Sequence, residues 1–311
     1  MSRGPVTVLD APSNLGLRPP GPGAEPGVRY LAATLRELGL VDRLGAADAG
    51  GIATPAYSPE PDPVSGFRNG PAIGAVTTAL ATDIGTLLDQ GAFPLVLGGD
   101  CSILLGPMLA LRRRGRYGLA FLDGHDDYSY AKDYERWFGY FVAGGLDLAL
   151  VTGHGPDLLA DIDGLRPYVD ERHVVHLGLQ REPDDLEWFD AKAFDDSPIA
   201  RFTADEIRTG GAGRAAEQAV RYLATERALP GFWIHLDVDV LHRSVMPAVD
   251  SPNPNGITFA ELQAILAGLL ASPQAVGMHV GIYDPELDPD RTAGAALVDT
   301  LADAFGTGDT P

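Results

Sequence analysis

Cysteine is almost absent from this chain, because Cys101 is the only one among its 311 residues. One thiol cannot form a disulfide within the chain, so covalent cross-links cannot hold the fold together. The disulfide-dense class of small secreted domains is therefore excluded, and a reducing compartment fits the composition. We expect a cytoplasmic protein.

Positive charge is also scarce. Lys and Arg total 23 against 43 Asp and Glu, which gives a formal net charge of -20 at pH 7. Nucleic-acid binding needs a concentrated basic surface that neutralises phosphates, and the only basic run here, from Arg112 to Arg116, is short. Cations suit the carboxyl end of a helix, so we expect this run to end a helix. The composition predicts no nucleic-acid partner.

Long uninterrupted apolar runs are missing as well. A helix that spans a bilayer needs roughly 18 or more predominantly apolar residues, and no continuous run reaches that length. The first residues lack the basic start and apolar core that mark a secretory signal. We expect a soluble protein with no membrane partner.

The chain does contain enough apolar residues for a large core, since 45% of it is hydrophobic. We expect one domain over residues 1–305 and a frayed C-terminal tail over 306–311. Short apolar segments alternate with longer segments of helical periodicity, which indicates an α/β fold whose parallel sheet is covered on both faces. The expected strands are 6–9, 93–97, 119–122, 174–177, 232–236 and 276–282, and the expected helices include 215–227 and 259–270.

Residues of metal-binding type gather after two of these expected strands. The first cluster is Asp123, His125 and Asp127, and the second is Asp237 and Asp239. Alternate side chains of an extended segment point the same way, so each cluster projects its side chains together. In a parallel sheet both clusters would lie in the crevice beyond the carboxyl ends of the strands. A third strand end, at 98–102, could bring Asp100 or Cys101 to the same crevice.

Carboxylates with one imidazole are hard and borderline ligands, which favour Mn²⁺ or a similar divalent ion. Two such ions about 3.5 to 4 Å apart lower the pKa of a bound water, which becomes a nucleophile near neutral pH. Hydrolysis is the reaction expected of that arrangement. The alternative is that these aspartates only form turns and cap helices.

The segments 98–102, 123–127 and 235–239 resemble, in order and context, the three metal motifs of the arginase/agmatinase (ureohydrolase) family. The resemblance extends to residues 283–289 and so covers nearly the whole chain. It implies a divergent member with a three-layer α/β/α fold, a mainly parallel central sheet, and assembly into homo-oligomers, usually trimers or hexamers. It also implies a binuclear manganese centre, at which a metal-bound hydroxide hydrolyses guanidino groups of small molecules to urea and an amine.

The resemblance assigns a role to each member of the two clusters. Asp123 and Asp237 would bridge the two ions. Asp127 would complete the first metal site and orient the nucleophile, and His125 and Asp239 would complete the second site.

The chain departs from the family pattern at three positions. Cys101 stands where the family has a metal-binding histidine, and a softer, oxidisable thiolate would make the first ion weak, different or absent. The alternative reading of Cys101 is a small buried hydrophobe. The glutamate that grips the substrate in the family is replaced by Ile282 or Tyr283, and the proton-shuttling histidine is replaced within 141–145. These changes move the expected substrate away from arginine and agmatine.

Two histidines outside these ligand positions are candidate site residues. His235 shares a face with Asp237, so it is a candidate catalytic residue that contacts the ligands from behind. His154 lies in a loop that could contact substrate. The remaining histidines near expected strands, His173, His176 and His279, are expected to be structural.

The leading hypothesis is a metal-dependent hydrolase that cleaves a non-peptide carbon–nitrogen bond in a linear guanidino or amidino small molecule. A member of the family that has lost catalysis and serves as a binding or assembly subunit is the second hypothesis. A deacetylase with a single zinc is the third, and the paired Asp-x-Asp fits it less well. Metal content would distinguish the three hypotheses. The hydrolase predicts two ions per chain, the binding subunit none, and the deacetylase one zinc.

Overall fold

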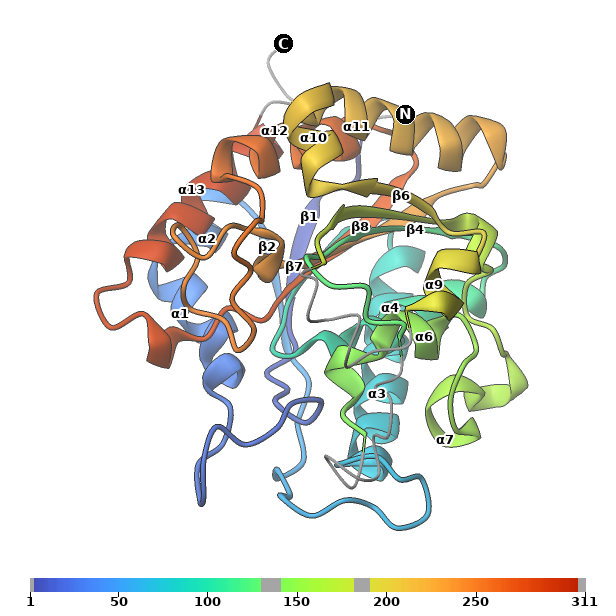
Figure 1. Ribbon diagram of the computed structural model, residues 1–311, viewed down its shortest axis with the longest axis vertical. Coiled ribbons are helices and arrows are strands. Elements are labelled where there is room, and N and C mark those ends of the chain that lie inside the picture. The colour runs from blue at the N-terminus through green and yellow to red at the C-terminus, as the bar shows by residue number, and fades with distance from the viewer. Residues whose placement is uncertain (1–2, 130–140, 182–190, 307–311) are drawn as a thin grey trace.

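An eight-stranded parallel sheet lies at the centre of the computed structural model, which describes residues 3–129, 141–181 and 191–306 (Figure 1). The strand order is β2-β1-β3-β8-β7-β4-β5-β6, and each neighbouring pair runs parallel. The strands are β1 (Val6–Asp10), β2 (Ala47–Gly51), β3 (Phe93–Leu97), β4 (Gly118–Leu122), β5 (Val174–Leu179), β6 (Ala200–Thr203), β7 (Phe232–Asp237) and β8 (Ala275–Gly281).

The central strands are mostly apolar because both faces of the sheet are covered. Every residue of β3, β4 and β7 is buried. Alternate residues of β4 enter different cores, with Ala120 and Leu122 on one face and Leu119 and Phe121 on the other. This burial on two faces confirms the predicted three-layer α/β fold.

Helices cover one face of the sheet with the core that contains Ala120 and Leu122 (Figure 1). These helices are α1 (Leu31–Glu37), α2 (Leu40–Leu44), α10 (Ala204–Gly210), α11 (Ala212–Val220), α12 (Phe259–Leu270) and α13 (Thr292–Gly306). Two of these helices, α10 and α12, begin with a capping box, in which Thr203 pairs with Glu206 and Thr258 pairs with Glu261. The expected helix 259–270 is α12.

The opposite face carries the second core, which surrounds Leu119 and Phe121. Its helices are α3 (Gly70–Asp89), α4 (Leu105–Arg112), α6 (Asp147–Val151), α7 (Asp157–Ala160) and α9 (Lys192–Asp196). Helix α4 ends at Arg112, as the basic run predicted. Helix α3 is long and apolar enough to cross a membrane by length and composition alone, but half of that stretch is buried in the fold, as in a core helix.

Short tight turns join many of these elements. The 3₁₀ helices are η1 (Gly27–Tyr30), η2 (Cys101–Leu104), η3 (Ala143–Gly145), η4 (Ile162–Gly164), η5 (Glu171–His173), η7 (Val238–Val240) and η8 (Pro285–Leu287), and a π-helical turn, η6 (Arg221–Glu226), extends α11. The expected helix 215–227 is therefore α11 with this turn.

All six expected strands are present, and the two strands that the sequence did not predict are the two edges of the sheet. Strand β2 reads Ala-Asp-Ala-Gly-Gly and is exposed throughout, so it has no apolar pattern. Strand β6 is only four residues long and half-buried. Of the expected tail, Gly306 ends α13, and 307–311 lie outside the described residues.

Candidate metal centre

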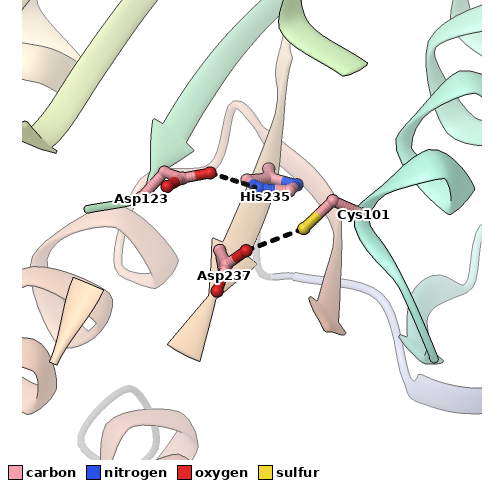
Figure 2. A group of neighbouring side chains, drawn as sticks. All are labelled: Cys101, Asp123, His235 and Asp237. Atoms are coloured by element: carbon pink, nitrogen blue, oxygen red, sulfur yellow. Dashed lines mark hydrogen bonds and ion pairs between the residues drawn. The ribbon is translucent and has the colours of Figure 1, made fainter. Parts of the chain in front are cut away.

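The predicted ligands lie at the carboxyl ends of the sheet's strands, where four neighbouring strands, β3, β8, β7 and β4, end side by side. Cys101 follows β3, Asp123 follows β4, and Asp237 is the last residue of β7 (Figure 2). These three residues are 0 to 3% exposed. Residues separated by more than a hundred positions along the chain therefore face one another in a buried cluster.

Each of the two bridging candidates uses one carboxylate oxygen to form a turn. Asp123 Oδ1 accepts from the His125 backbone N–H at 2.6 Å, and Asp237 Oδ1 accepts from that of Asp239 at 2.7 Å. The second oxygens face the cluster: Asp237 Oδ2 accepts from the Cys101 thiol at 2.8 Å, and Asp123 Oδ2 has no hydrogen-bond partner. Turn formation and metal binding are therefore compatible at these aspartates.

The cluster contains three groups of potential ligand atoms that are each close enough to surround a cation. Within each group the atoms lie within 4.8 Å of one another. The groups are Cys101, Asp123, His235 and Asp237; Cys101, Asp127 and Asp147; and Asp123, His125 and Asp239.

The donor set fits divalent cations. Among the described residues, three buried side-chain atoms of the cluster have no hydrogen-bond partner: Asp123 Oδ2, Asp147 Oδ2 and His235 Nε2. A buried polar atom without a partner costs stability unless something else satisfies it. Asp123 belongs to two of the three groups, as a carboxylate that bridges two ions must.

The crowding of carboxylates shifts their protonation. Burial, followed by repulsion between neighbouring aspartates, raises the pKa of Asp123, Asp147 and Asp237 well above the ordinary value. Burial also raises the pKa of Asp127 to about 8, although His125 opposes this shift. These carboxylates would be ionised together only if nearby positive charge compensates them.

His125 and Asp239 form an ion pair within the cluster. The Nδ1 of His125 lies 2.9 Å from Asp239 Oδ2. Burial lowers the pKa of His125, but the charge and hydrogen bond of Asp239 outweigh it and raise that pKa to about 10. This ion pair occupies the atoms predicted to complete the second metal site, so an ion there would displace the His125 proton.

A chain of hydrogen bonds behind the cluster fixes the tautomer of His235. Trp233 Nε1 donates to His279 Nδ1 at 2.8 Å, and His279 Nε2 lies 2.6 Å from His235 Nδ1. The indole N–H can only donate, so neutral His279 carries its proton on Nε2 and donates it to His235. Neutral His235 then carries its own proton on Nε2, which lies 3.7 Å from Asp123 Oδ2 (Figure 2).

The imidazole rings of His235 and His279 in this series of hydrogen bonds are both neutral. Burial lowers the pKa of His279 to about 3 and that of His235 well below its ordinary value. The ring of His235 also stacks on Phe121, with centroids 4.2 Å apart. His235 is therefore held rigidly as a hydrogen-bond donor toward the cluster.

We expect Trp233→Phe to release this tautomer. The substitution leaves His279 Nδ1 without its donor, at a cost of about 1 to 3 kcal/mol in the free energy of unfolding. Long-range ¹H–¹⁵N spectra of histidine-labelled protein should show the wild-type His235 protonated at Nε2 and a mixture of tautomers in the variant. His176 is an internal control, because its Nε2 lies 2.6 Å from the His125 carbonyl oxygen and should not change. A wild-type His235 protonated at Nδ1 would contradict the assignment.

Asp147 is a member of the cluster that the sequence did not reveal. It is the first residue of α6 and is fully buried, with Leu146 and Leu148 on either side. Its Oδ1 accepts from the Leu148 backbone N–H at 2.8 Å, and its free Oδ2 lies 3.9 Å from His235 Nδ1. The only signal in the sequence was one aspartate within an otherwise apolar segment.

The three predicted substrate contacts lie in different surroundings. Ile282 directly follows β8, between the ends of β3 and β7, and its backbone N–H donates to the Gly99 carbonyl at 2.8 Å. Tyr283 is fully buried and donates its hydroxyl to Asp288 at 2.8 Å, so it offers no free group to a substrate. His154 is half-exposed and pairs with Glu171 at 2.8 Å. Of the three, only Ile282 adjoins the cluster.

A parallel sheet that holds buried carboxylates and imidazoles at adjacent strand ends defines an α/β protein with a cluster of potential metal ligands. The family model described as the arginase family matches residues 5–305. The chain therefore belongs to the arginase family, as the three motifs predicted.

Individual relatives support this assignment at low identity. The chain is 26% identical over 309 residues to an arginase from Bacillus caldovelox, covering 97% of this chain and 98% of that one. It is 26% identical over 304 residues to an arginase from Staphylococcus aureus strain MRSA252, covering 97% of each. The solved structure of the Bacillus caldovelox arginase superposes with a TM-score of 0.84 at 25% identity, over 97% of this chain and 98% of that one.

Proposed function

We propose that this protein is a metal-dependent hydrolase that cleaves a non-peptide carbon–nitrogen bond in a guanidino or amidino small molecule. Membership of the arginase family supports a hydrolase of this kind. The observation that carries the proposal is the buried carboxylate of Asp123, which has one oxygen without a hydrogen-bond partner and belongs to two groups of potential ligands. The substrate is a linear amidine whose identity the family does not fix.

The proposed ligands divide into two sites around Asp123 and Asp237, which would bridge them. Cys101 and Asp127 would face the first ion, and His125 and Asp239 would face the second. Bound divalent ions supply Lewis acidity and a water of lowered pKa. We propose manganese, because hard oxygen ligands with one imidazole suit it. Assembly as a trimer or hexamer and a cytoplasmic location remain predictions.

The protein's own groups would then orient the reactants. The Asp127 carboxylate can accept a hydrogen bond from the attacking water and hold its lone pair toward the trigonal carbon of the substrate. The Nε2–H of His235 lies 3.7 Å from the Asp123 Oδ2, beyond hydrogen-bond distance, so it would act on that carboxylate through its dipole or after a small closure of the gap. We therefore assign His235 a positioning role.

Ile282 sets the expected preference among substrates. An apolar side chain beside the cluster offers no carboxylate to pair with a guanidinium, and a hydrogen bond to a charged group contributes about 1.5 to 3 kcal/mol. We expect arginine to be turned over roughly 10 to 100 times less efficiently than by an enzyme with a glutamate there.

Ile282→Glu tests this expectation. The variant should raise kcat/KM for arginine relative to that for less basic formimino compounds, and Ile282→Leu is the control that keeps the position apolar. The backbone of Ile282 has a φ of +74°, which a β-branched residue adopts only under constraint, so both variants also relieve strain. An unchanged ratio of the two substrates in Ile282→Glu would show that this position does not contact the guanidinium.

The second candidate function is a binding or assembly subunit without catalysis. One observation favours it: the Cys101 thiol donates to Asp237 at 2.8 Å, so part of the cluster satisfies itself without a cation. Metal content distinguishes the two functions. The hydrolase should hold two ions per chain after Mn²⁺ loading and dialysis, a bare subunit none, and a deacetylase-like protein one zinc.

Activity requires a separate measurement. A panel of guanidino and formimino compounds should be screened for release of urea, ammonia or formamide by the Mn²⁺-loaded protein. Release that disappears on chelation and returns on reloading supports the hydrolase. Fewer than one ion per chain after loading would refute the binuclear centre.

A further inference from the structure

The first metal site lacks a ligand of the usual kind. Cys101 occupies the position of the expected histidine, and its sulfur already contacts Asp237 at 2.8 Å. A hard divalent ion prefers oxygen or imidazole ligands to a thiol. Another group must replace the missing ligand if the first ion is to be held well.

Two further buried side chains belong to the ligand groups that contain Cys101, although the family motifs do not assign them as ligands. They are Asp147 and His235, and each has one atom without a hydrogen-bond partner. His235 cannot serve as a ligand in the tautomer that its hydrogen bonds require. Its Nδ1 accepts from His279, and its Nε2 carries the proton that the Trp233 hydrogen bond fixes. A metal ligand needs a free lone pair, and neither nitrogen has one.

Asp147 does have a free lone pair in a fixed place. Its Oδ2 has no hydrogen-bond partner, and the fully buried side chain belongs to the group formed with Cys101 and Asp127. The Ala149 backbone N–H donates to the Asp127 carbonyl at 3.1 Å, which ties α6 to the metal motif that contains Asp127. The turn before α6 is anchored by a hydrogen bond from Gly144 N to the Gly16 carbonyl at 2.9 Å.

We propose that Asp147 is an additional carboxylate ligand of the first ion and replaces the missing histidine there. This inference rests on the proposed binuclear centre and adds a ligand to it. The half-buried carboxylate of Asp127 and the buried carboxylate of Asp147 are neighbours in this group, and a divalent cation held by both would offset their mutual repulsion. A carboxylate in place of an imidazole makes the first site harder and more negative. This site should therefore favour Mn²⁺ over Zn²⁺ more strongly than a site with the histidine would.

Asp147→Asn tests the inference, because it keeps the shape of the side chain and removes the charge. Full-length protein is loaded with Mn²⁺ alone and dialysed, and its metal content and affinity are measured by mass spectrometry and calorimetry. We expect two ions in the wild type and one in the variant, or at least a tenfold weaker first ion. Asp147→Ser provides a second variant with less steric demand if the first does not fold.

Asp288→Asn is the matched control. Asp288 is also a buried aspartate, but its carboxylate accepts from Tyr283 and from the Gly294 backbone N–H, and it belongs to none of the ligand groups. The control should retain two ions. This comparison separates the loss of a ligand from the general effect of neutralising a buried carboxylate.

Cobalt substitution reports on the ligands directly. The visible d–d bands of the Co²⁺ protein should change in Asp147→Asn, whereas Cys101→Ser should remove a sulfur charge-transfer band only if the thiol is also a ligand. The inference would be overturned if Asp147→Asn held two ions with unchanged affinity and unchanged Co²⁺ bands. It would also be overturned if the variant retained both ions but had a raised KM, because Asp147 would then contact the substrate. A wild type that binds no metal would instead refute the proposed function.

Discussion

Asp123→Asn is expected to abolish the metal centre, because Asp123 belongs to two of the three groups of potential ligands. The amide keeps the oxygen that accepts from the His125 backbone N–H, so the turn should survive. The substitution replaces the free Oδ2 with an amide nitrogen and removes the negative charge. An amide cannot bridge two cations as a carboxylate does. We expect metal content to fall from two ions to one or none.

The loss of activity should be correspondingly large. Metal ions contribute several kcal/mol to stabilisation of the transition state, which corresponds to roughly a thousandfold in rate. Metal content and product release should be measured on the same preparation. Asp100→Asn is the control from the end of β3, because among the described residues the carboxylate of Asp100 accepts from Ser13 and Ser102 and belongs to none of the ligand groups. Two tightly held ions in Asp123→Asn would exclude a bridging role.

Metal removal is expected to make the protein unstable at high pH. The pKa of Asp127 in the folded protein is about 8, against an ordinary 3.8, because burial disfavours the charged form. The pKa values of Asp123, Asp147 and Asp237 are raised in the same way. Groups whose pKa is raised on folding stabilise the protein while they are protonated, and that stability is lost as pH rises toward the folded-state pKa.

The expected window lies between about pH 4 and pH 8, where the unfolded chain ionises these carboxylates and the folded chain resists ionisation. His125 acts in the same direction, because its pKa rises from 6.5 to about 10 on folding, so its stabilisation is also lost with rising pH. Bound cations reverse the trend, since they bind the ionised carboxylates and compete with protons.

Thermal unfolding at pH 5 and pH 8, with and without Mn²⁺, measures this effect. A ligand at a thousandfold excess over its Kd stabilises by about 4 kcal/mol per site. At 2 °C or more per kcal/mol, we expect Mn²⁺ to raise Tm by roughly 8 °C or more at pH 8 and by less at pH 5. Metal-free Asp123→Asn should depend less on pH than the metal-free wild type. A metal-free Tm that rises from pH 5 to pH 8 would contradict the assignment.

The central part of the fold could be predicted from sequence because each central strand is mostly apolar. Strands β3, β4 and β7 are buried on both faces, so their sequences leave few alternatives to a strand in a parallel sheet. The edge strand β2 could not be predicted, because it is exposed and contains no apolar pattern. Its place in the sheet comes from parallel pairing with β1.

The metal motifs were readable for a similar reason. Asp123, His125 and Asp127 are close in sequence, so the turn that follows β4 brings them to the same cluster, although this segment is not extended as predicted and Asp127 has a φ of +39°. Tyr283 was a weaker prediction, because whether a side chain at a strand end faces the crevice or the core depends on its neighbours. It turned inward and pairs with Asp288.

The sequence by itself determined the parallel α/β class, the family, and the aspartates and histidine that follow β4 and end β7, because these depend on local spacing and apolar patterning. Only the tertiary structure decided what surrounds them. His279 meets His235 because β7 and β8 pair in a register that sets these residues opposite each other. Asp147 reaches the cluster because α6 begins against the metal motif. Such contacts join residues far apart in the chain, and no local pattern encodes them.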